Sequence, residues 1–414
     1  MPNSDKVRVV VNGSASEYEY WTEISITSEL NTVARSFQIG TTAKLPQSAD
    51  LLTAFKVGDE VQVYIGNDLV LTGYIDATPI SYDGTNVTAA VIGRSRTEDI
   101  IDCSPAPTGY DFSATMNSQK WSATRSVGDF VEPEITIAAN QFKDVPLKQA
   151  VAQLIAPYGI HLICELDNDI VNGNISQTIK DDDTILKALQ NLVGTTGLYF
   201  IDDEFGNLKI VNEEKRSHNL ASLSLGKNIL VASAQFDGSK LFQQYRMLSS
   251  QKGTGTQTGK NLQSYTDSAD SDISRFRYLC KTDQKQNGNA SSSKKSEAKY
   301  RRGQFYKTSY TVVGWRQFDG GELWKANTLV TIQDDILNNS QEMLITKVTY
   351  TLSSAGMLTT LDCIPPAGFK PDQQTQQQDK AVVASSGSNN SKWASVDNGL
   401  DLVGKDNQTV TVNT

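Results

Sequence analysis

Two segments of the chain repeat one pattern of short alternating apolar and polar runs. The first extends from Gly58 to Gly93 and the second from Asn327 to Ile364. In each, three runs with apolar residues at every second position are separated by turns rich in glycine, asparagine, aspartate and serine. Period-two alternation is typical of half-buried strands, and such turns favour antiparallel neighbours. The pattern therefore predicts two similar β-units, each with three antiparallel strands.

The N-terminal part continues the β pattern. Residues 6–11 alternate between polar and valine positions, and Asn12-Gly13 is a typical hairpin turn. Two further strands are indicated around residues 21–27 and 36–40. We therefore expect residues 1–98 to form a first β domain that ends with the first repeated unit.

Residues 99–216 have a different hydrophobic pattern, in which helical and strand periodicities alternate. The segment 145–156 has helical spacing, with Pro146 in the first turn and Asp144 as a candidate cap. Residues 158–164 are typical of a strand, residues 184–194 of an amphipathic helix ending at Gly194, and residues 198–211 of a hairpin. This order predicts a compact α+β domain.

Strand patterns return from residue 217 and include the second repeated unit. Residues 243–249 and 306–315 are typical of strands, 251–260 of a loop, and 291–302 of a polar helix. Residues 217–370 are therefore expected to form a second β domain with a polar insertion. The glutamine-rich start of residues 371–414 predicts a flexible linker and docking tail. The apolar residues of this tail are Trp393, Leu400, Leu402, Val410 and Val412.

Length and composition change this picture little. The 414 residues suffice for several domains, and no apolar run approaches the ~20 residues of a membrane span. The N-terminus has no apolar signal-peptide core, so we expect synthesis in a cytoplasm. The net charge of −9 argues against a dedicated nucleic-acid binder, which needs clustered Lys and Arg. It is compatible with DNA that slides past without adhering.

Cysteine and histidine give little support for chemistry. Cys103, Cys164, Cys280 and Cys363 are scattered and form no Cys-x-x-Cys pair, so neither a zinc nor a redox motif is indicated. The two histidines are His161 and His218. His161 and Cys164 are three apart in one predicted strand, which places their side chains on opposite faces. A Cys–His nucleophile pair is therefore disfavoured, and no Gly-x-Ser-x-Gly elbow occurs.

Three other motifs also fail on inspection. Asp181–Asp183 could suggest a metal site but precedes a helix, where Asp182 or Asp183 is a natural N-cap. The calcium-like stretch 167–174 places Val171 at a ligand position. The stretch 253–260 has Thr254 where a phosphate-binding loop needs glycine. We therefore expect no catalytic, cofactor-binding or metal-binding residue, and no cofactor.

Five stretches, in their order along the chain, carry a family resemblance. They are residues 92–104, 145–159, 179–211, 313–327 and 343–361. Together they resemble the baseplate hub proteins of contractile-tailed phages, especially the Mu-like tail protein and its late-control relatives. The resemblance covers about residues 1–370.

The resemblance implies a structural virion protein of the tail baseplate, assembled in the bacterial cytoplasm and without enzymatic activity. It implies a homotrimer with two similar β-barrel domains per chain, so that three chains form a ring of six barrels around the DNA passage. Such a ring would adapt a sixfold tail tube to a threefold central spike. The implied partners are the spike protein, tail tube or tube-initiator proteins and other baseplate proteins, with no insertion into a membrane.

Two alternatives stay open at this point. Some tail hubs carry peptidoglycan hydrolase domains, which need a pair of catalytic carboxylates that the sequence does not mark. The hub portion of a type VI secretion spike is the second alternative. Such proteins usually continue into a repetitive β-helical needle, which this sequence does not show.

Overall fold

The computed structural model describes most of the chain up to residue 369. The described residues are 5–12, 17–18, 21–44, 55–82, 86–118, 130–194, 196–250, 262–268, 273–283 and 290–369. The chain divides into two compact units, residues 1–374 and 375–414. The glycine- and threonine-rich stretch 251–260 and the proposed tail 371–414 lie outside the described residues.

The N-terminal strands form what we call the first sheet unit. They are β1 (Val7–Val11), β2 (Glu17–Tyr18), β3 (Glu23–Glu29), β4 (Ser36–Lys44), β5 (Glu60–Ile65), β6 (Asp68–Ala77), β7 (Ile80–Tyr82) and β8 (Asn86–Ser95). The predicted alternation is visible in β3, where Ile24 and Ile26 are buried and their neighbours are not. The strands β6 and β8 approach so closely that a Cβ at Gly93 would lie 2.0 Å from the backbone oxygen of Tyr74.

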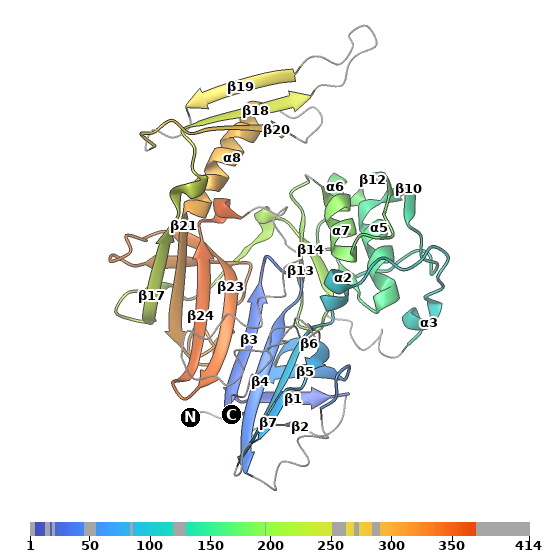
Figure 1. Cartoon of the computed structure of the whole chain (residues 1–414), viewed down its shortest axis with the longest axis vertical. Helices are drawn as coiled ribbons and strands as arrows, with labels where there is room; N and C mark the ends of the chain where they lie inside the picture. Colours follow the sequence, from blue (N-terminus) through green and yellow to red (C-terminus); the bar gives the residue numbers. More distant parts are fainter. Residues whose placement is uncertain are drawn as a thin grey trace, which may run out of the picture. The chain divides into compact units, whose positions relative to one another are not determined.

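A second group of strands forms the second sheet unit. They are β15 (Ser217–His218), β16 (Leu223–Ser224), β17 (Ile229–Phe236), β21 (Tyr306–Val313), β22 (Thr328–Gln333), β23 (Glu342–Ser353) and β24 (Gly356–Ile364). Figure 1 shows β23 and β24 of this unit beside β3 and β4 of the first unit.

The two units have the same strand order. The order is β3-β4-β8-β6-β5 in the first unit and β17-β21-β24-β23-β22 in the second. Ile75 pairs with Gly93 as Ile345 pairs with Cys363, so equivalent positions differ by 270 residues. The prediction of two similar antiparallel units is confirmed. The units differ in their flanking strands, since β1 is antiparallel to β5 whereas β15 and β16 are parallel to β22.

The two units share one sheet and one hydrophobic core. The strand β23 pairs with β3, so 15 strands form a continuous sheet in the described part of the chain. Buried side chains from both units, among them Phe37, Tyr350 and Leu361, belong to one cluster. The described strands do not close into two separate barrels, and the barrel arrangement therefore stays a prediction.

Helices and short strands between the two units form an α+β domain with its own core. The helices are α2 (Glu98–Asp102), α3 (Ser113–Met116), α5 (Leu147–Ile155), α6 (Asp169–Asn172) and α7 (Ile185–Val193). The strands are β9 (Phe130–Val131), β10 (Gln141–Pro146), β11 (Leu162–Ile163), β12 (Asn174–Thr178), β13 (Tyr199–Asp202) and β14 (Leu208–Val211). The predicted hairpin is β13–β14, and Gly194 ends α7 as predicted.

The predicted helix caps are wrong in both cases. Asp144 lies in β10, at a bulge opposite β12, and has a positive φ of 56°. The backbone around Asp144 therefore pairs with β12 and does not cap the helix. Thr184 caps α7 by accepting a hydrogen bond from Lys187 N at 3.3 Å, because it directly precedes the helix. Asp182 and Asp183 therefore lie too early to cap.

The predicted strand 158–164 is much shorter than expected. A 3-10 turn (Ala156–Tyr158) continues from α5, and Gly159 takes the left-handed conformation with φ of 71°. Only Leu162–Ile163 then pair, with β9 and β14.

An insertion between β17 and β21 carries a three-stranded sheet and one helix. The strands are β18 (Gln244–Ser250), β19 (Leu262–Ser268) and β20 (Tyr278–Asp283), and the helix is α8 (Ala290–Phe305). The helix confirms the predicted polar helix 291–302. The remaining elements are the 3-10 turns Glu213–Lys215, Gly238–Lys240 and Pro366–Gly368. None of the helices in the described residues is long and apolar enough to span a membrane.

Candidate functional site

The joint between the two sheet units is a stretch of antiparallel pairing between β23 and β3, which we call the internal seam. The first residues of β23 pair with β22, and residues 347–352 pair with β3. Just beyond the pairing, Leu30 N donates to Thr346 O at 2.8 Å. One long strand therefore belongs to both units.

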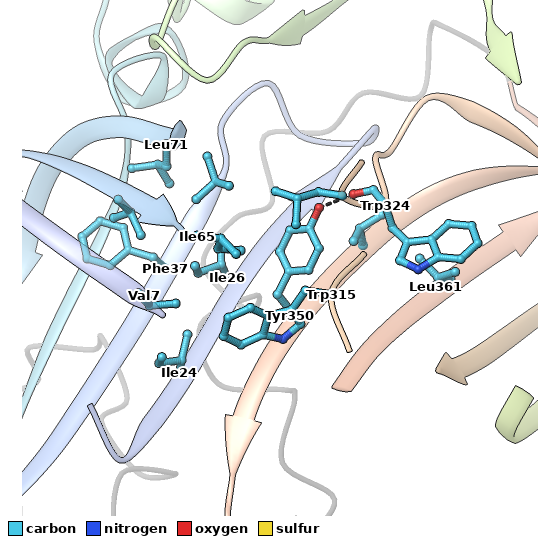
Figure 2. Packing of buried hydrophobic residues seen from close by; sticks show 14 of the residues in the cluster. Val7, Ile24, Ile26, Phe37, Ile65, Leu71, Trp315, Trp324, Tyr350 and Leu361 are labelled. Atoms are coloured by element: carbon cyan, nitrogen blue, oxygen red, sulfur yellow. Dashed lines mark hydrogen bonds between the residues drawn. The ribbon is translucent and has the colours of Figure 1, made fainter. Parts of the chain in front are cut away.

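Buried aromatic side chains pack behind the internal seam. Figure 2 shows Tyr350 of β23 between Ile26 of β3 and Trp324 of the second unit. The Tyr350 phenol donates a hydrogen bond to the Trp324 carbonyl, and burial raises the pKa of this phenol. Trp315 Nε1 donates to Thr351 O at 3.1 Å. The seam is thus a part of the core and not a surface contact.

Charged side chains also join the two units. Arg316 of the second unit lies 2.8 Å from Asp5 and 2.8 Å from Asp68 of the first. On the sheet itself, Lys347 Nζ lies 3.6 Å from Glu29 Oε2. These pairs are partly exposed, so each adds little stability, but their geometry fixes how one unit follows the other.

Several strands at the margins of the sheet units pair on one side only among the described residues, and we call two of them the open edges. The first is β7, which pairs only with β8, and the second is β17, which pairs only with β21. Ile80 on β7 is 47% exposed, whereas its equivalent Tyr350 is 6% exposed inside the internal seam. Unpaired strand edges are templates for pairing with another chain.

A row of hydroxyl groups crosses the face of the sheet opposite the core. It extends over both units on adjacent strands and consists of Thr311, Thr360, Thr349, Thr27 and Ser36. The hydroxyls of Thr311 and Thr360 lie 3.3 Å apart, and those of Thr27 and Thr349 lie 3.4 Å apart. This row carries no charge across the seam.

A buried polar cluster connects the first sheet unit to the α+β domain. Arg35 Nε lies 3.2 Å from Asp202 Oδ1, and Asp202 Oδ2 accepts from Ser95 Oγ at 2.8 Å and from Arg35 N at 3.0 Å. Burial raises the pKa of Asp202 although Arg35 opposes this shift. The cluster holds the hairpin β13–β14 against β8.

A cavity of about 900 Å³ lies next to this cluster, where the two sheet units and the α+β domain meet. Three of its carboxylates have the following structural partners. Asp203 accepts from Phe205 N and Asn207 N at 3.0 and 2.8 Å, Glu165 lies 2.6 Å from Lys209 Nζ, and Asp68 pairs with Arg316. These three carboxylates therefore take part in contacts that hold the surrounding elements together.

A second, partly buried charged cluster was not indicated by any sequence motif. Arg94 Nε lies 2.8 Å from Asp76 and 3.0 Å from Glu98, and Arg94 Nη2 lies 2.8 Å from Asp102. Burial and the neighbouring Asp76 raise the pKa of Glu98 to about 9. One guanidinium faces three carboxylates, so the most buried carboxyl keeps its proton at neutral pH.

The structure does not bring His161 and Cys164 into a catalytic pair. The imidazole of His161 packs edge-on against Phe130 at 5.3 Å, and the Cys164 thiol donates to Leu166 O at 3.6 Å. His218 is exposed and lies 2.9 Å from Glu342.

The acidic motifs serve local structure. Asp181 accepts from Asn140 Nδ2 at 2.6 Å, and Asn168 caps α6 within the calcium-like stretch. Among the described residues, no three His, Cys, Asp or Glu side chains are grouped to hold a metal ion. Sequence reasoning missed the open edges. The 270-residue spacing of the repeat was the available signal, because it aligns exposed Ile80 with Tyr350.

Comparison with sequence families identifies three matches in order along the chain. Residues 6–95 match the Mu phage baseplate assembly protein GpP-like N-terminal family, residues 128–212 the baseplate hub protein gp44-like second domain, and residues 289–372 the fourth domain of Mu phage baseplate assembly protein GpP. Together these segments span more than half of the chain.

Individual relatives also point to baseplate hub and tail proteins. The chain is 26% identical to the baseplate hub protein gp44 of Escherichia phage Mu over 364 residues, 84% of this chain and 85% of that protein. The crystal structure of the 43 kDa tail protein of prophage MuSo2 from Shewanella oneidensis matches with a TM-score of 0.69 and 26% identity. That match covers 88% of this chain and 99% of the other.

The tail protein of Neisseria meningitidis MC58 shares the fold, with a TM-score of 0.66 at 18% identity over 89% of this chain and 98% of that one. Matches in three separate segments, in order and with the same fold, go beyond a shared β architecture. The chain therefore belongs to the baseplate hub family of Mu-like phage tails.

Proposed function

We propose that three copies of this chain form a closed ring in which six sheet units alternate around the axis. The observation that carries this proposal is the shared strand order of the two units together with the internal seam. One chain already contains one unit-to-unit joint. Repeating that joint between chains generates a ring, provided that the rotation closes.

Such a ring would act as the adaptor between tail tube and central spike. Six similar sheet units present near-sixfold symmetry on one side. The α+β domain and the α8 insertion occur once per chain and present threefold symmetry. The proposed partners are therefore a sixfold tube or tube-initiator protein, a threefold spike and other baseplate proteins.

We further propose that the face of the sheet that carries the hydroxyl row borders the passage for DNA. The threonine and serine row carries no cations to replace phosphate counterions, and the neighbouring Lys347 is paired with Glu29, so DNA would pass without being held. The net charge of −9 supports the same conclusion.

The domain division proposed from the sequence places the ring in residues 1–98 and 217–370 and the α+β domain in residues 99–216. Residues 371–414 would be a docking arm for a neighbour, and the protein would be located in the tail baseplate after assembly in the host cytoplasm. Deleting residues 372–414 should leave the trimer intact and weaken capture of the spike protein. A truncated chain that no longer trimerises would show that the tail belongs to the ring.

Mass measurement in solution tests the proposed ring directly. We expect three times the mass of the single chain, and a monomer or dimer at all concentrations would refute the ring. Zymography on peptidoglycan tests the structural role separately, since a cleared band would show hydrolase activity.

A further inference from the structure

The open edges β7 and β17 are equivalents of the two strands that meet in the internal seam. Ile80 pairs with Ala89 on β8 as Tyr350 pairs with Thr359 on β24, and both pairs differ by the same 270 positions. The strand β7 therefore corresponds to the half of β23 that pairs with β3. Pro79 interrupts the first copy, which is why β6 and β7 are separate strands while β23 is continuous.

The second open edge, β17, is the equivalent of β3. Ile24 of β3 lies opposite Ile39 on β4, and Ala232 of β17 lies opposite Tyr310 on β21. Ile39 and Tyr310 are equivalent because their partners on β8 and β24 again differ by 270 positions. By the same count, Ala234 takes the place of Ile26.

The backbone hydrogen bonds of both open edges point outward at matching residues. Ala90 N donates to Pro79 O at 3.0 Å, so Pro79 faces β8 and Ile80 faces the open edge. Asp237 N donates to Phe305 O at 2.9 Å, so every second residue from Asp237 faces β21 and Ala234 faces the open edge. The lack of an N–H on Pro79 therefore removes nothing from this edge.

The internal seam has the same alternation of hydrogen-bonded and non-hydrogen-bonded residue pairs. Since Leu30 N donates to Thr346 O, Tyr350 and Ile26 form a hydrogen-bonded pair, and Thr351 and Ser25 form a non-hydrogen-bonded pair. The equivalents of these two pairs are Ile80 with Ala234 and Ser81 with Ser233.

Resting on the proposed ring, we infer that β7 of one copy pairs antiparallel with β17 of the next copy, with Ile80 opposite Ala234. This pairing, which we call the external seam, covers the exposed Ile80 side chain with the small, partly buried Ala234. The positions equivalent to Lys347 and Glu29 are Ala77 and Asp237, so the ion pair of the internal seam has no counterpart. The external seam therefore relies on backbone hydrogen bonds and on Ile80.

Disulfide trapping tests the external seam and its register. We would introduce Ser81→Cys and Ser233→Cys together, after Cys280→Ser has removed the exposed native thiol. Non-hydrogen-bonded antiparallel pairs have Cα atoms about 4.5 Å apart, within disulfide range. Mild oxidation should give covalent dimers and trimers on a non-reducing gel. The matched control, Thr351→Cys with Ser25→Cys, should close within one chain and run as a monomer.

The possible outcomes separate this inference from the ring itself. If the protein is a trimer by mass but Ser81→Cys with Ser233→Cys gives no cross-link, the external seam is wrong and the ring stands. If Ser81→Cys cross-links better to Gln235→Cys, the register is wrong. If the protein is not a trimer, the proposed function fails first.

A second variant tests the apolar contact in the external seam. Ile80→Asp should weaken trimer formation by at least about tenfold, because a charge on a strand edge blocks pairing. Ile135→Asp in the α+β domain, at 48% exposure against 47% for Ile80, is the matched control and should leave trimer formation unchanged. Equal assembly of both variants would overturn the inference.

Discussion

Arg35 and Asp202 form an ion pair, with 3.2 Å between Nε and Oδ1, that ties the first sheet unit to the α+β domain. The Asp202 side chain is 7% exposed, and its carboxylate also accepts hydrogen bonds from Ser95 Oγ and Arg35 N. Because the two residues are 167 positions apart, this contact forms only when both parts have folded.

We expect Asp202→Asn to destabilise the protein by about 3 kcal/mol, because a buried guanidinium would lose its counter-charge. Urea unfolding, followed through the transition that includes the α+β domain, measures the effect. Glu165→Gln is the control, since its pair with Lys209 is partly exposed and its loss should change stability by less than about 0.5 kcal/mol. Equal effects of the two variants would contradict the structural role of Asp202.

Glu98 should make stability depend on pH. Burial, together with Asp76, raises the pKa of Glu98 from 4.5 to about 9, so the folded state holds a proton that the unfolded state releases. The stabilising contribution is complete below about pH 4.5 and is lost as pH rises through about 9.

Glu98→Gln should remove most of the pH dependence of the unfolding free energy. The variant should become more stable than the parent chain as the pH rises. Unfolding free energies measured at several pH values within that window test this. Asp102→Asn, at a half-exposed position beside the same Arg94, should leave this pH dependence in place. Parallel pH profiles for Glu98→Gln and the parent chain would show that Glu98 does not hold the proton.

The close approach of β6 and β8 should make Gly93 intolerant of any side chain. A Cβ there would lie 2.0 Å from Tyr74 O and 2.7 Å from the Phe37 ring, so we expect Gly93→Ala to cost about 3 kcal/mol. Gly40→Ala on the neighbouring strand is the control, since its Cβ would lie 3.6 Å from the nearest atom. Thermal unfolding of both variants provides the measurement, and similar melting temperatures would refute the steric argument.

Duplex DNA should bind weakly to the assembled protein. The hydroxyl row across the sheet is uncharged, and the chain has a net charge of −9. In an electrophoretic shift at moderate salt we expect little retention. Tight binding that weakens steeply with added salt would show phosphate contacts that the described face does not provide.

Local patterns in the sequence predicted the longer strands of both sheet units and α7, because each depends on neighbours within about ten residues. The strands β7 and β17 at the open edges were not predicted. The cap of α5 was wrong because Asp144 is used by a β-bulge, whose pairing with β12 lies about thirty residues away. The strand at Leu162 was overestimated because its partners, β9 and β14, are short.

The functional surfaces were harder to predict than the elements. Tyr350 and Ile26 are 324 positions apart, and the local sequence of neither strand predicts that the two strands pair. The repeat nevertheless contained the required information. Once the internal seam is known, the spacing of 270 residues places the proposed external seam at Ile80, a position outside the predicted strand runs.

The twelve residues of β23 serve both sheet units, and this has a consequence for unfolding. If the first unit melts, residues 347–352 of β23 lose their partners on β3, and the aromatic residues behind them lose their cover. If the second unit melts, β3 becomes a bare edge. Neither unit can therefore open without removing hydrogen bonds from the other, and we expect calorimetry to show a single cooperative transition for the duplicated sheet. A duplication that began as two modules would in this way have become one folding unit.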